Sequence, residues 1–253
     1  MNPQSLRVVT VSGALLSASL LVSAPASAQA PWSFSANIGA VSNYVWRGVT
    51  QSGDDAAIQG GLDAAHESGF YAGTWASNID WGAGGPNYEL DLYTGFGGAI
   101  NDDVSYDIGA IYYAYPDGRD SDFAELGASA SFKWFTLGLA YTVYGENDDG
   151  LFDDGDLYYF GGADFALPYD FGFGLRVGYY QFQNDEGEIT KYTAAGLPYT
   201  GTESYNYWHF GASISREAGE FGTFALNWDQ NNGETGLGYD TDPKFWVSWS
   251  KEF

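Results

Sequence analysis

The charged residues that could do chemistry occur one at a time along a chain of alternating apolar and polar positions. Six carboxylates and two arginines fall on the polar side of this alternation: Arg47, Asp63, Glu89, Asp91, Asp107, Glu125, Asp164 and Arg176. Carboxylates around a water-filled passage attract cations and repel anions. With acids outnumbering bases six to two, the set predicts the lining of a cation-preferring pore. The alternative is a set of charges that only pair with one another inside a closed structure.

Two pairs within this set are expected to approach each other. The turn at 168–170 should set Asp164 and Arg176 diagonally opposite on neighbouring strands, within reach of a salt bridge. By the same reasoning, Asp91 and Asp107 should approach across the turn near Asn101. Two like charges in that position would either attract a cation or raise the pKa of one carboxyl, and plain solvation is the alternative.

A further group of acids lies in the glycine-rich segment 145–156. Its oxygen ligands suit Ca²⁺, but the segment lacks the spaced acids and the terminal glutamate of an EF-hand loop. We therefore expect residues 146–156 to form a solvated acidic loop. Divalent ions that bridge this loop to lipopolysaccharide are the alternative.

The elements that position these residues begin after an export signal. Arg7 precedes the short apolar stretch 8–22, and Ala-x-Ala sites follow at 26–28 and 28–30. The stretch is too short for a bilayer, which needs roughly 20 apolar residues. Residues 1–30 are thus predicted to be a signal peptide cleaved after Ala28 or Ala30. Residues 31–253 are predicted to be one domain.

The composition excludes several kinds of protein. The 253 residues include 33 acids against 9 bases, so the basic face needed for nucleic acid is missing. No cysteine is present, which rules out disulfides and thiolate sites. After residue 30 no apolar run approaches the length of a transmembrane helix. Aromatic residues make up 18% of the chain, and this composition leaves a soluble β-sandwich, a lectin-like domain and an outer-membrane barrel open.

A period of two runs through the rest of the chain and predicts strands with one apolar and one polar face. Twelve segments follow it: 34–46, 58–64, 70–79, 88–96, 104–112, 126–132, 135–143, 157–165, 171–179, 208–214, 224–228 and 245–253. The facing of 70–79 stays open, because Tyr71, Trp75 and Ile79 compete with Phe70 for the apolar side. An even strand number is what bacterial membrane barrels require.

The connections between these segments alternate in length. Short turns are expected at 66–69, 99–103, 133–134, 168–170 and 217–220, and longer polar loops at 48–55, 78–87, 115–122, 145–156, 183–204 and 229–243. Short periplasmic turns opposite longer outer loops are typical of outer-membrane barrels with both termini in the periplasm. The polar faces must then point into the barrel, because unpaired charges facing lipid would cost several kcal/mol each.

Aromatic residues on the apolar faces are sorted along the strand axis. Phenylalanines mark the predicted periplasmic ends: Phe34, Phe96, Phe132, Phe135, Phe165, Phe171 and Phe253. Tyrosines and tryptophans mark the outer ends: Tyr44, Trp46, Tyr88, Tyr112, Tyr141, Tyr179, Trp208 and Trp228. Tyr and Trp are favoured where hydrocarbon meets headgroups, so we expect two aromatic girdles.

Motifs in the first third of the chain resemble those of the TorF-type porin family, also known as the Gcw_chp proteins of proteobacteria: SNYVWRGVTQ at 42–51, GFYAGTWASN at 69–78 and YELDLYTG at 88–95. The ending VSWSKEF at 247–253 resembles the last strand of the family and the general outer-membrane assembly signal, from which Lys251 departs. The resemblance implies an outer-membrane barrel with pore activity. It implies no substrate and no catalytic residues.

These observations predict an all-β, transmembrane, antiparallel up-and-down barrel of about twelve strands in the outer membrane. The predicted function is a porin-like channel for passive diffusion of small hydrophilic solutes, with a closed structural or adhesive surface barrel as the alternative. Its expected partners are outer-membrane lipid, lipopolysaccharide and the barrel-assembly machinery, which would recognise the strand ending at Phe253.

An outer-membrane lipid hydrolase is the weaker alternative. Such barrels use a serine and a histidine on the lipid-facing surface. Here His66 is expected in a periplasmic turn and His209 on the polar face, so neither lies where that base is needed. No nucleophile, base and orienting group converge in the sequence, and no cofactor is implied.

Overall fold

A computed structural model describes residues 31–147, 150–193 and 196–253 of the chain. The predicted signal peptide lies outside these residues. None of the helices in the described part has the length and apolarity to cross a membrane.

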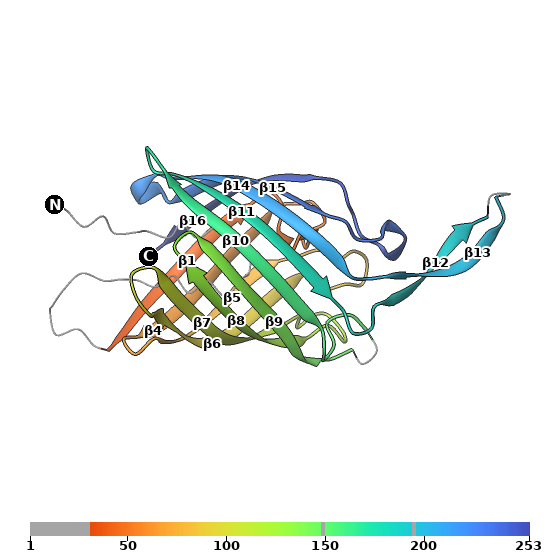
Figure 1. The fold of residues 1–253 in the computed structure, drawn as a ribbon, viewed down its shortest axis with the longest axis horizontal. Coiled ribbons are helices and arrows are strands. Elements are labelled where there is room, and N and C mark those ends of the chain that lie inside the picture. The colour runs from red at the N-terminus through yellow and green to blue at the C-terminus, as the bar shows by residue number, and fades with distance from the viewer. Residues whose placement is uncertain (1–30, 148–149, 194–195) are drawn as a thin grey trace.

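The described residues form a closed antiparallel barrel of twelve strands (Figure 1). Around the barrel the strands are β1 (Trp32–Val41), β4 (Ala57–His66), β5 (Phe70–Asn78), β6 (Tyr88–Ala99), β7 (Val104–Ala114), β8 (Phe123–Phe132), β9 (Phe135–Gly145), β10 (Leu157–Leu167), β11 (Phe171–Gln181), β14 (Tyr207–Glu217), β15 (Thr223–Asn231) and β16 (Lys244–Glu252). The first and last of these pair with each other and close the sheet. The predicted fold class and strand number are confirmed.

Closure follows from the environment that the period-two pattern predicts. In hydrocarbon every backbone N–H and C=O must be paired within the protein, and a sheet achieves this only by removing its edges. The five short turns, between β4 and β5, β6 and β7, β8 and β9, β10 and β11, and β14 and β15, all lie where the sequence predicts them. β1 begins and β16 ends at the same end of the barrel as these turns.

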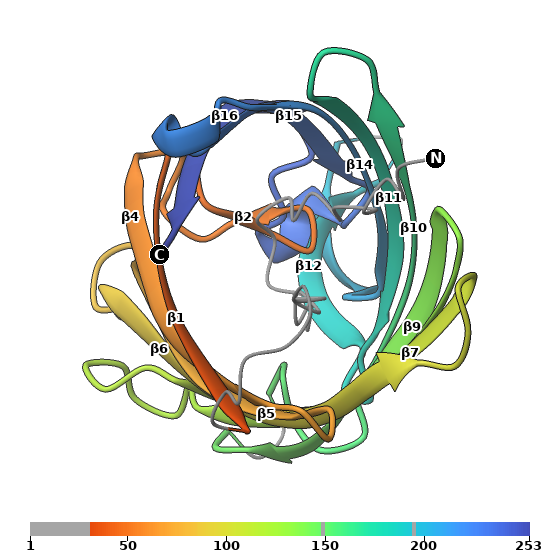
Figure 2. The same cartoon turned by 90° about the vertical axis from the view of Figure 1, so that its left-hand side faces the viewer.

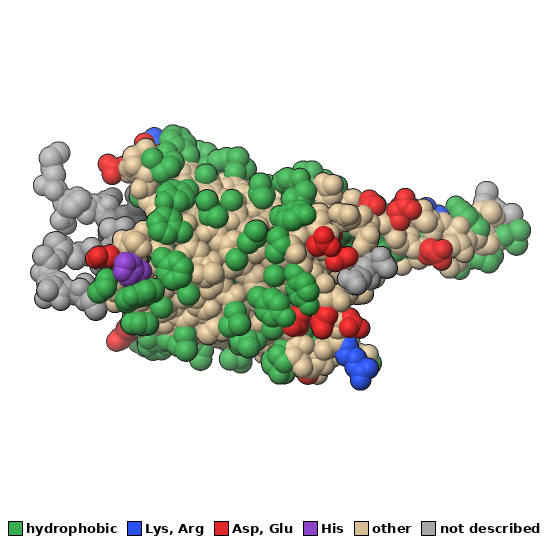
Figure 3. Space-filling model, turned by 90° about the horizontal axis from the view of Figure 1, so that it is seen from below, with side chains coloured by type: hydrophobic (Ala, Val, Ile, Leu, Met, Phe, Trp, Pro, Cys, Tyr) green, Lys and Arg blue, Asp and Glu red, His purple; other side chains and the backbone are tan. Residues whose placement is uncertain are grey.

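The outer surface of the barrel is apolar. Phe34 is 78% exposed and Leu62 is 62% exposed, although both lie in strand interiors rather than in loops. Figure 3 shows hydrophobic side chains over the barrel wall, with most acids gathered at its ends. Such a band is stable only against lipid, so the protein is a transmembrane barrel of the outer membrane.

The facing of β5, which the sequence left open, is now settled. Phe70 faces outward, whereas Tyr71 and Ile79 are buried inside the barrel.

Two hairpins do not form part of the barrel wall. β12 (Glu186–Tyr192) pairs with β13 (Pro198–Ser204), and this hairpin extends well beyond the outer end of the barrel (Figure 1). β2 (Val45–Trp46) pairs with β3 (Val49–Thr50), and this second hairpin folds into the interior of the barrel (Figure 2). Two short 3-10 helices, η1 (Gly219–Phe221) and η2 (Thr235–Leu237), complete the described elements.

The inward hairpin corrects the prediction for the first strand. The strand ends at Val41 rather than at residue 46, and Tyr44 and Trp46 are 4% and 6% exposed inside the barrel instead of joining the outer aromatic girdle. The break has a local cause. The Asn43 side-chain oxygen accepts hydrogen bonds from the Thr50 hydroxyl (2.7 Å) and the Ser52 hydroxyl (3.3 Å), and such side-chain bonds compete with the strand ladder. We call residues 42–56 the inner loop.

Candidate channel lumen

The inner loop is anchored to the barrel wall by a buried ion pair. The Arg47 guanidinium donates two parallel hydrogen bonds to the Glu125 carboxylate of β8, at 2.8 Å from Nη1 and 2.6 Å from Nη2. The two side chains are only 4% and 2% exposed. A charge this deeply buried is tolerated only when it is paired and hydrogen-bonded, which the two-pronged geometry achieves.

Aromatic rings enclose the same guanidinium. Its central carbon lies 3.9 Å from the ring centre of Tyr158, 4.2 Å from that of Trp46 and 5.0 Å from that of Tyr180. Ring faces carry partial negative charge, so these contacts favour a cation. Aromatic residues from several strands therefore fill the outer half of the lumen around the tip of the inner loop.

Gly48 makes this close approach possible. Its φ is +78°, and a Cβ at this position would lie 2.4 Å from the Cβ of His209 on β14. The Asn231 amide nitrogen donates to the Gly48 carbonyl (2.8 Å), which ties the loop to β15. Arg47 also has a positive φ of 48°. Two consecutive positive φ values are the signature of the tight type I′ hairpin turn, here between β2 and β3.

Polar contacts at the outer rim hold the base of the inner loop. The Lys244 ammonium bridges Asp54 of the loop (2.6 Å) and Asp240 of the loop 232–243 (2.5 Å). The Trp81 indole N–H donates to the Gln51 side chain (3.0 Å). The loop is thus fixed at its tip by the wall and at its base by two neighbouring outer loops.

A second ion pair lies in the wall itself. Arg176 on β11 pairs with Asp229 on β15 across the intervening β14, at 3.2 Å. Gly211 of β14 lies between them, and a Cβ there would meet Asp229 Oδ1 at 2.5 Å and Arg176 Nε at 3.0 Å. Asp164 is diagonal to Arg176 as predicted, because Gly162 is opposite Arg176 and Gly174 is opposite Asp164. The ion pair that Arg176 forms, however, is with Asp229.

The predicted approach of Asp91 to Asp107 is wrong. The register places Asp91 opposite Tyr113 and Asp107 opposite Gly97, so the two acids are separated by six rows of the β6–β7 ladder. At about 3.3 Å per residue, six rows correspond to about 20 Å. The turn at 100–103 determines this register, and a diagonal contact would need an offset of two rows.

The neighbour of Asp91 is instead Glu89, two residues earlier on the same face of β6. Both side chains are buried in the outer half of the lumen, where the Tyr44 hydroxyl donates to Glu89 (3.4 Å). Asp91 Oδ1 has no hydrogen-bond partner among the described residues. The two acids therefore form a buried carboxyl pair beside the inner loop, with no basic partner among the described ion pairs.

The periplasmic half of the lumen is more polar and better hydrated. Asp107 accepts a hydrogen bond from the Tyr71 hydroxyl (2.9 Å), and Asp63 accepts one from the Tyr93 hydroxyl (2.5 Å). Asp63 and Asp107 are half-buried, while Asp164 is exposed although it lies on the inner face of β10. Water therefore reaches this half of the lumen.

All eight residues singled out in the sequence lie on the inner side of the barrel, although Arg47 reaches it from a loop. The sequence reasoning missed Asp229, Tyr158 and Tyr180. Asp229 had a usable signal, since it shares its face of β15 with Asn227 and Asn231. The two tyrosines also had a signal, because each is adjacent to a lipid-facing tyrosine, Tyr159 or Tyr179, and therefore falls on the inner face of its strand.

His209 lies inside the barrel, as predicted. Its Nε2 is 2.7 Å from the Tyr158 hydroxyl, and the side chain is buried, so it cannot reach lipid at the membrane surface. His66 ends β4 next to a short turn, where its Nδ1 contacts the Ser68 hydroxyl (2.8 Å). This contact lies at the periplasmic end of the barrel and not at the outer membrane surface.

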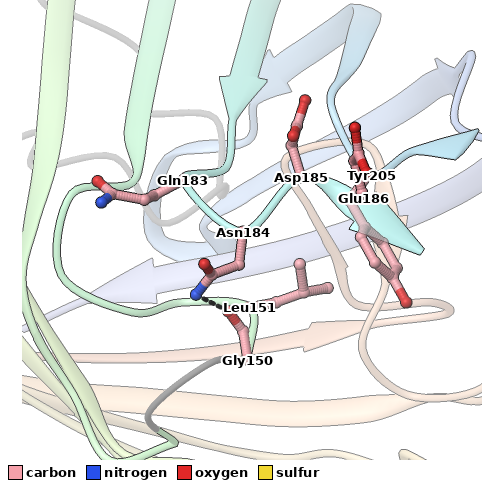
Figure 4. Close-up of a pocket in the computed structure, with 7 residues that line it drawn as sticks. All are labelled: Gly150, Leu151, Gln183, Asn184, Asp185, Glu186 and Tyr205. Atoms are coloured by element: carbon pink, nitrogen blue, oxygen red, sulfur yellow. Dashed lines mark hydrogen bonds between the residues drawn. The ribbon is translucent and has the colours of Figure 1, made fainter.

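The outer end of the barrel holds a shallow hollow of about 460 Å³ (Figure 4). It is lined by Gly150, Leu151, Gln183, Asn184, Asp185, Glu186 and Tyr205. The acidic segment 145–156 forms one side, although Asp148 and Asp149 fall outside the described residues. No three His, Cys, Asp or Glu side chains in the described part are grouped to hold a metal ion.

Asp156, at the end of this segment, is buried. One of its carboxylate oxygens accepts the Gln183 backbone N–H (2.7 Å), and the other has no partner among the described groups. Burial raises the pKa of Asp156 to about 6.

Together, the apolar outer band, the closed sheet and the polar interior define an outer-membrane β-barrel with a loop folded into its lumen. The chain belongs to the Gcw_chp family, described as a bacterial protein of unknown function, whose model matches residues 25–253. This confirms the Gcw_chp resemblance seen in the sequence. No curated protein matches the chain.

Solved porins share the fold. The KdgM porin superposes with a TM-score of 0.54 at 7% identity, covering 87% of this chain and 98% of its own. The NanC porin gives a TM-score of 0.51 at 13% identity, covering 86% and 98%. KdgM has also been solved in complex with disordered oligogalacturonate, and that structure gives a TM-score of 0.52 at 6% identity. At such identities the likeness establishes a common barrel fold.

Proposed function

We propose that the protein is a narrow porin-like channel through which small hydrophilic solutes diffuse, with a preference for cations. The observation that carries this proposal is the charge imbalance of the lumen. In the described part of the barrel, the lumen acids Asp63, Glu89, Asp91, Asp107, Glu125, Asp164 and Asp229 stand against Arg47 and Arg176, and each arginine is already paired with one acid. Asp63, Glu89, Asp91, Asp107 and Asp164 remain without a basic partner among the described ion pairs.

The fold supports passage of solutes of limited size. Twelve strands enclose more space than an eight-stranded barrel, whose interior is filled by side chains, and less than the open lumen of a 16-stranded porin. The inner loop occupies part of that space, so it sets the size limit in the outer half. The complex of the KdgM porin with an oligogalacturonate supports solute passage through a barrel of this architecture. Lipid and lipopolysaccharide would surround the apolar band, and the assembly machinery would recognise the strand ending at Phe253.

Single-channel recording of the refolded protein in a planar bilayer tests the proposal. Discrete conductance steps are expected, and a salt gradient should give a reversal potential on the cation-selective side. Silent bilayers that contain correctly folded barrel, verified by its resistance to unfolding in cold detergent, would contradict the proposal.

A closed structural barrel is the second candidate, because buried aromatic side chains pack the outer half of the lumen. A variant in which a short Gly-Ser turn replaces residues 43–55 separates the two possibilities. A channel narrowed by the inner loop should conduct more after the replacement and should already conduct in the wild type. A barrel that is closed in its native form should conduct only after the replacement.

A further inference from the structure

The wall groups that hold Arg47 have the chemistry of a binding site for a guanidinium ion. Glu125 supplies the two parallel acceptor oxygens, and the rings of Tyr158 and Tyr180 cover the planar cation. The two-pronged geometry matches guanidinium and not ammonium, which is a compact point charge. We call Glu125, Tyr113, Tyr158 and Tyr180 the guanidinium cradle.

The cradle is assembled by the wall and not by the inner loop. The hydroxyls of Tyr113 and Tyr180 both donate to Glu125, at 3.3 and 3.4 Å. The Tyr158 hydroxyl is fixed by its contact with His209 (2.7 Å). These contacts join β7, β8, β10, β11 and β14, so the cradle would keep its shape if the loop withdrew. A preformed site of this kind binds its ligand at low conformational cost.

Arg47 fills the cradle imperfectly. Its Nε is buried and has no hydrogen-bond partner among the described groups. Its backbone adopts a φ of 48°, a region that non-glycine residues seldom occupy. Both features cost free energy when Arg47 is docked in the cradle. A free guanidinium compound has no tether to the loop backbone, so it need not bear these costs.

We propose that the guanidinium cradle is the recognition site for solutes that carry a guanidinium group, and that Arg47 occupies it when no such solute is present. This rests on the proposed channel function and specifies its substrate class. The buried acids Glu89 and Asp91 are electrostatic neighbours of Tyr113 in the cradle, and they bring no positive charge that would compete with the solute. A solute that takes the place of Arg47 releases the tip of the inner loop and so widens the route.

The binding part of the proposal can be tested without transport. Arg47→Ala vacates the cradle, and its lowered melting temperature should recover in millimolar methylguanidinium but not in methylammonium. The double variant Arg47→Ala/Glu125→Gln should show no recovery, because the two-pronged acceptor is gone. If Arg47→Ala recovers equally with both ions, or with neither, the cradle does not select guanidinium and the proposal is overturned.

The transport part uses the wild-type barrel in proteoliposomes. Agmatine and cadaverine have equal charge and similar length, but only agmatine carries a guanidinium group. Agmatine should enter about tenfold faster, the effect of one charged hydrogen bond, and Glu125→Gln should remove the difference. Equal entry in a conducting wild-type channel would overturn this inference and leave the channel function intact. A folded barrel that passes no ion and no solute would overturn the channel function, and the melting experiment would still judge the cradle.

Discussion

At the scale of the single residue, Gly211 shows how a missing side chain creates room for an ion pair. Arg176 and Asp229 meet across it, and an added methyl group would overlap both. Gly211→Ala should therefore separate the partly buried Arg176 from the buried Asp229 and lower the free energy of unfolding by about 2 kcal/mol. Urea unfolding of the barrel in lipid vesicles measures this change.

Gly162→Ala is the matched control for Gly211. Gly162 lies opposite Arg176 on β10 and faces the same lumen, but its Cβ would meet nothing nearer than the Leu175 carbonyl at 3.5 Å. This substitution should be neutral or slightly stabilising, since alanine restricts the unfolded chain. Equal losses in the two variants would show that lumen glycines matter for the strand and not for the ion pair.

Asp156 predicts a specific dependence of stability on pH. Its pKa is raised to about 6 by burial, against an ordinary value of about 4. Between these values the folded protein holds a proton that the unfolded chain releases, so stability falls as pH rises through this window and is constant above it. Asp156→Asn should abolish this component. The melting temperature of the wild type, relative to that of the variant, should therefore fall as the pH rises from 4 to 6.

Asp240→Asn supplies a control of opposite sign. A hydrogen bond from Lys244 lowers the pKa of Asp240, so its contribution is present at neutral pH and disappears as pH falls through the lowered pKa. The wild-type advantage over this variant should shrink on acidification. If both variants changed in the same direction, the shift would reflect overall charge and not these two environments.

At the scale of the element, the strands and turns were predictable and the inner loop was not. A period of two and the alternation of short and long connections determine strand number, facing and the pairing of neighbours. Residues 42–50 defeat this reasoning, because Tyr44 and Trp46 continue the apolar parity of β1 after the strand has ended at Val41. Only the hydrogen bonds of Asn43 within the loop and the paired positive φ values of Arg47 and Gly48 reveal the reversal, and a period of two signals neither of them.

The same reasoning explains which site predictions succeeded. Wall acids such as Asp63 and Asp164 face inward because side chains alternate between the two faces of a strand, and the lipid-facing side does not tolerate a charge. Their partners are harder to predict, since Arg176 bypasses its diagonal neighbour to reach Asp229 two strands away. Pairing across an intervening glycine depends on barrel curvature, which one strand's sequence does not encode.

Gly48→Ala should loosen the inner loop. Alanine at a φ of +78° is strained, and its Cβ would overlap His209, so the loop tip should leave the wall. We expect a larger unitary conductance in planar bilayers. Gly82→Ala is the control, because Gly82 has a φ of +86° in a neighbouring outer loop with open space around it. An unchanged conductance in Gly48→Ala would mean that the loop does not limit the pore.

The projecting β12–β13 hairpin should be dispensable for the fold. Its strands pair only with each other among the described elements, and Glu186 lies opposite Ser204 at its base. Joining these two residues through an Asn-Gly turn should change the free energy of unfolding by less than about 1 kcal/mol, or about 2–4 °C in melting temperature. β12 also contacts η2, where Leu237 lies beside Gly187, and a larger loss would show that the hairpin supports the barrel through this contact.

At the scale of the whole molecule, the barrel separates two kinds of charge. Acids in the outer half are buried against the inner loop, whereas Asp63, Asp107 and Asp164 lie on the hydrated periplasmic half of the wall. A fixed charge acts on passing ions within roughly 8 Å at physiological salt. The hydrated acids are therefore the ones that can act on mobile ions without any movement of the loop.

Selectivity should therefore follow the position of the charges and not their number. Replacing Asp63, Asp107 and Asp164 by asparagine should move the reversal potential in a salt gradient toward the non-selective value. Replacing Glu67, Asp102 and Glu220, which lie exposed in the short turns at the same end, removes the same charge outside the lumen and should have a smaller effect. Because both triple variants change the net charge equally, equal shifts would assign selectivity to the overall field of this acidic protein. Unequal shifts would assign it to the three acids of the lumen wall.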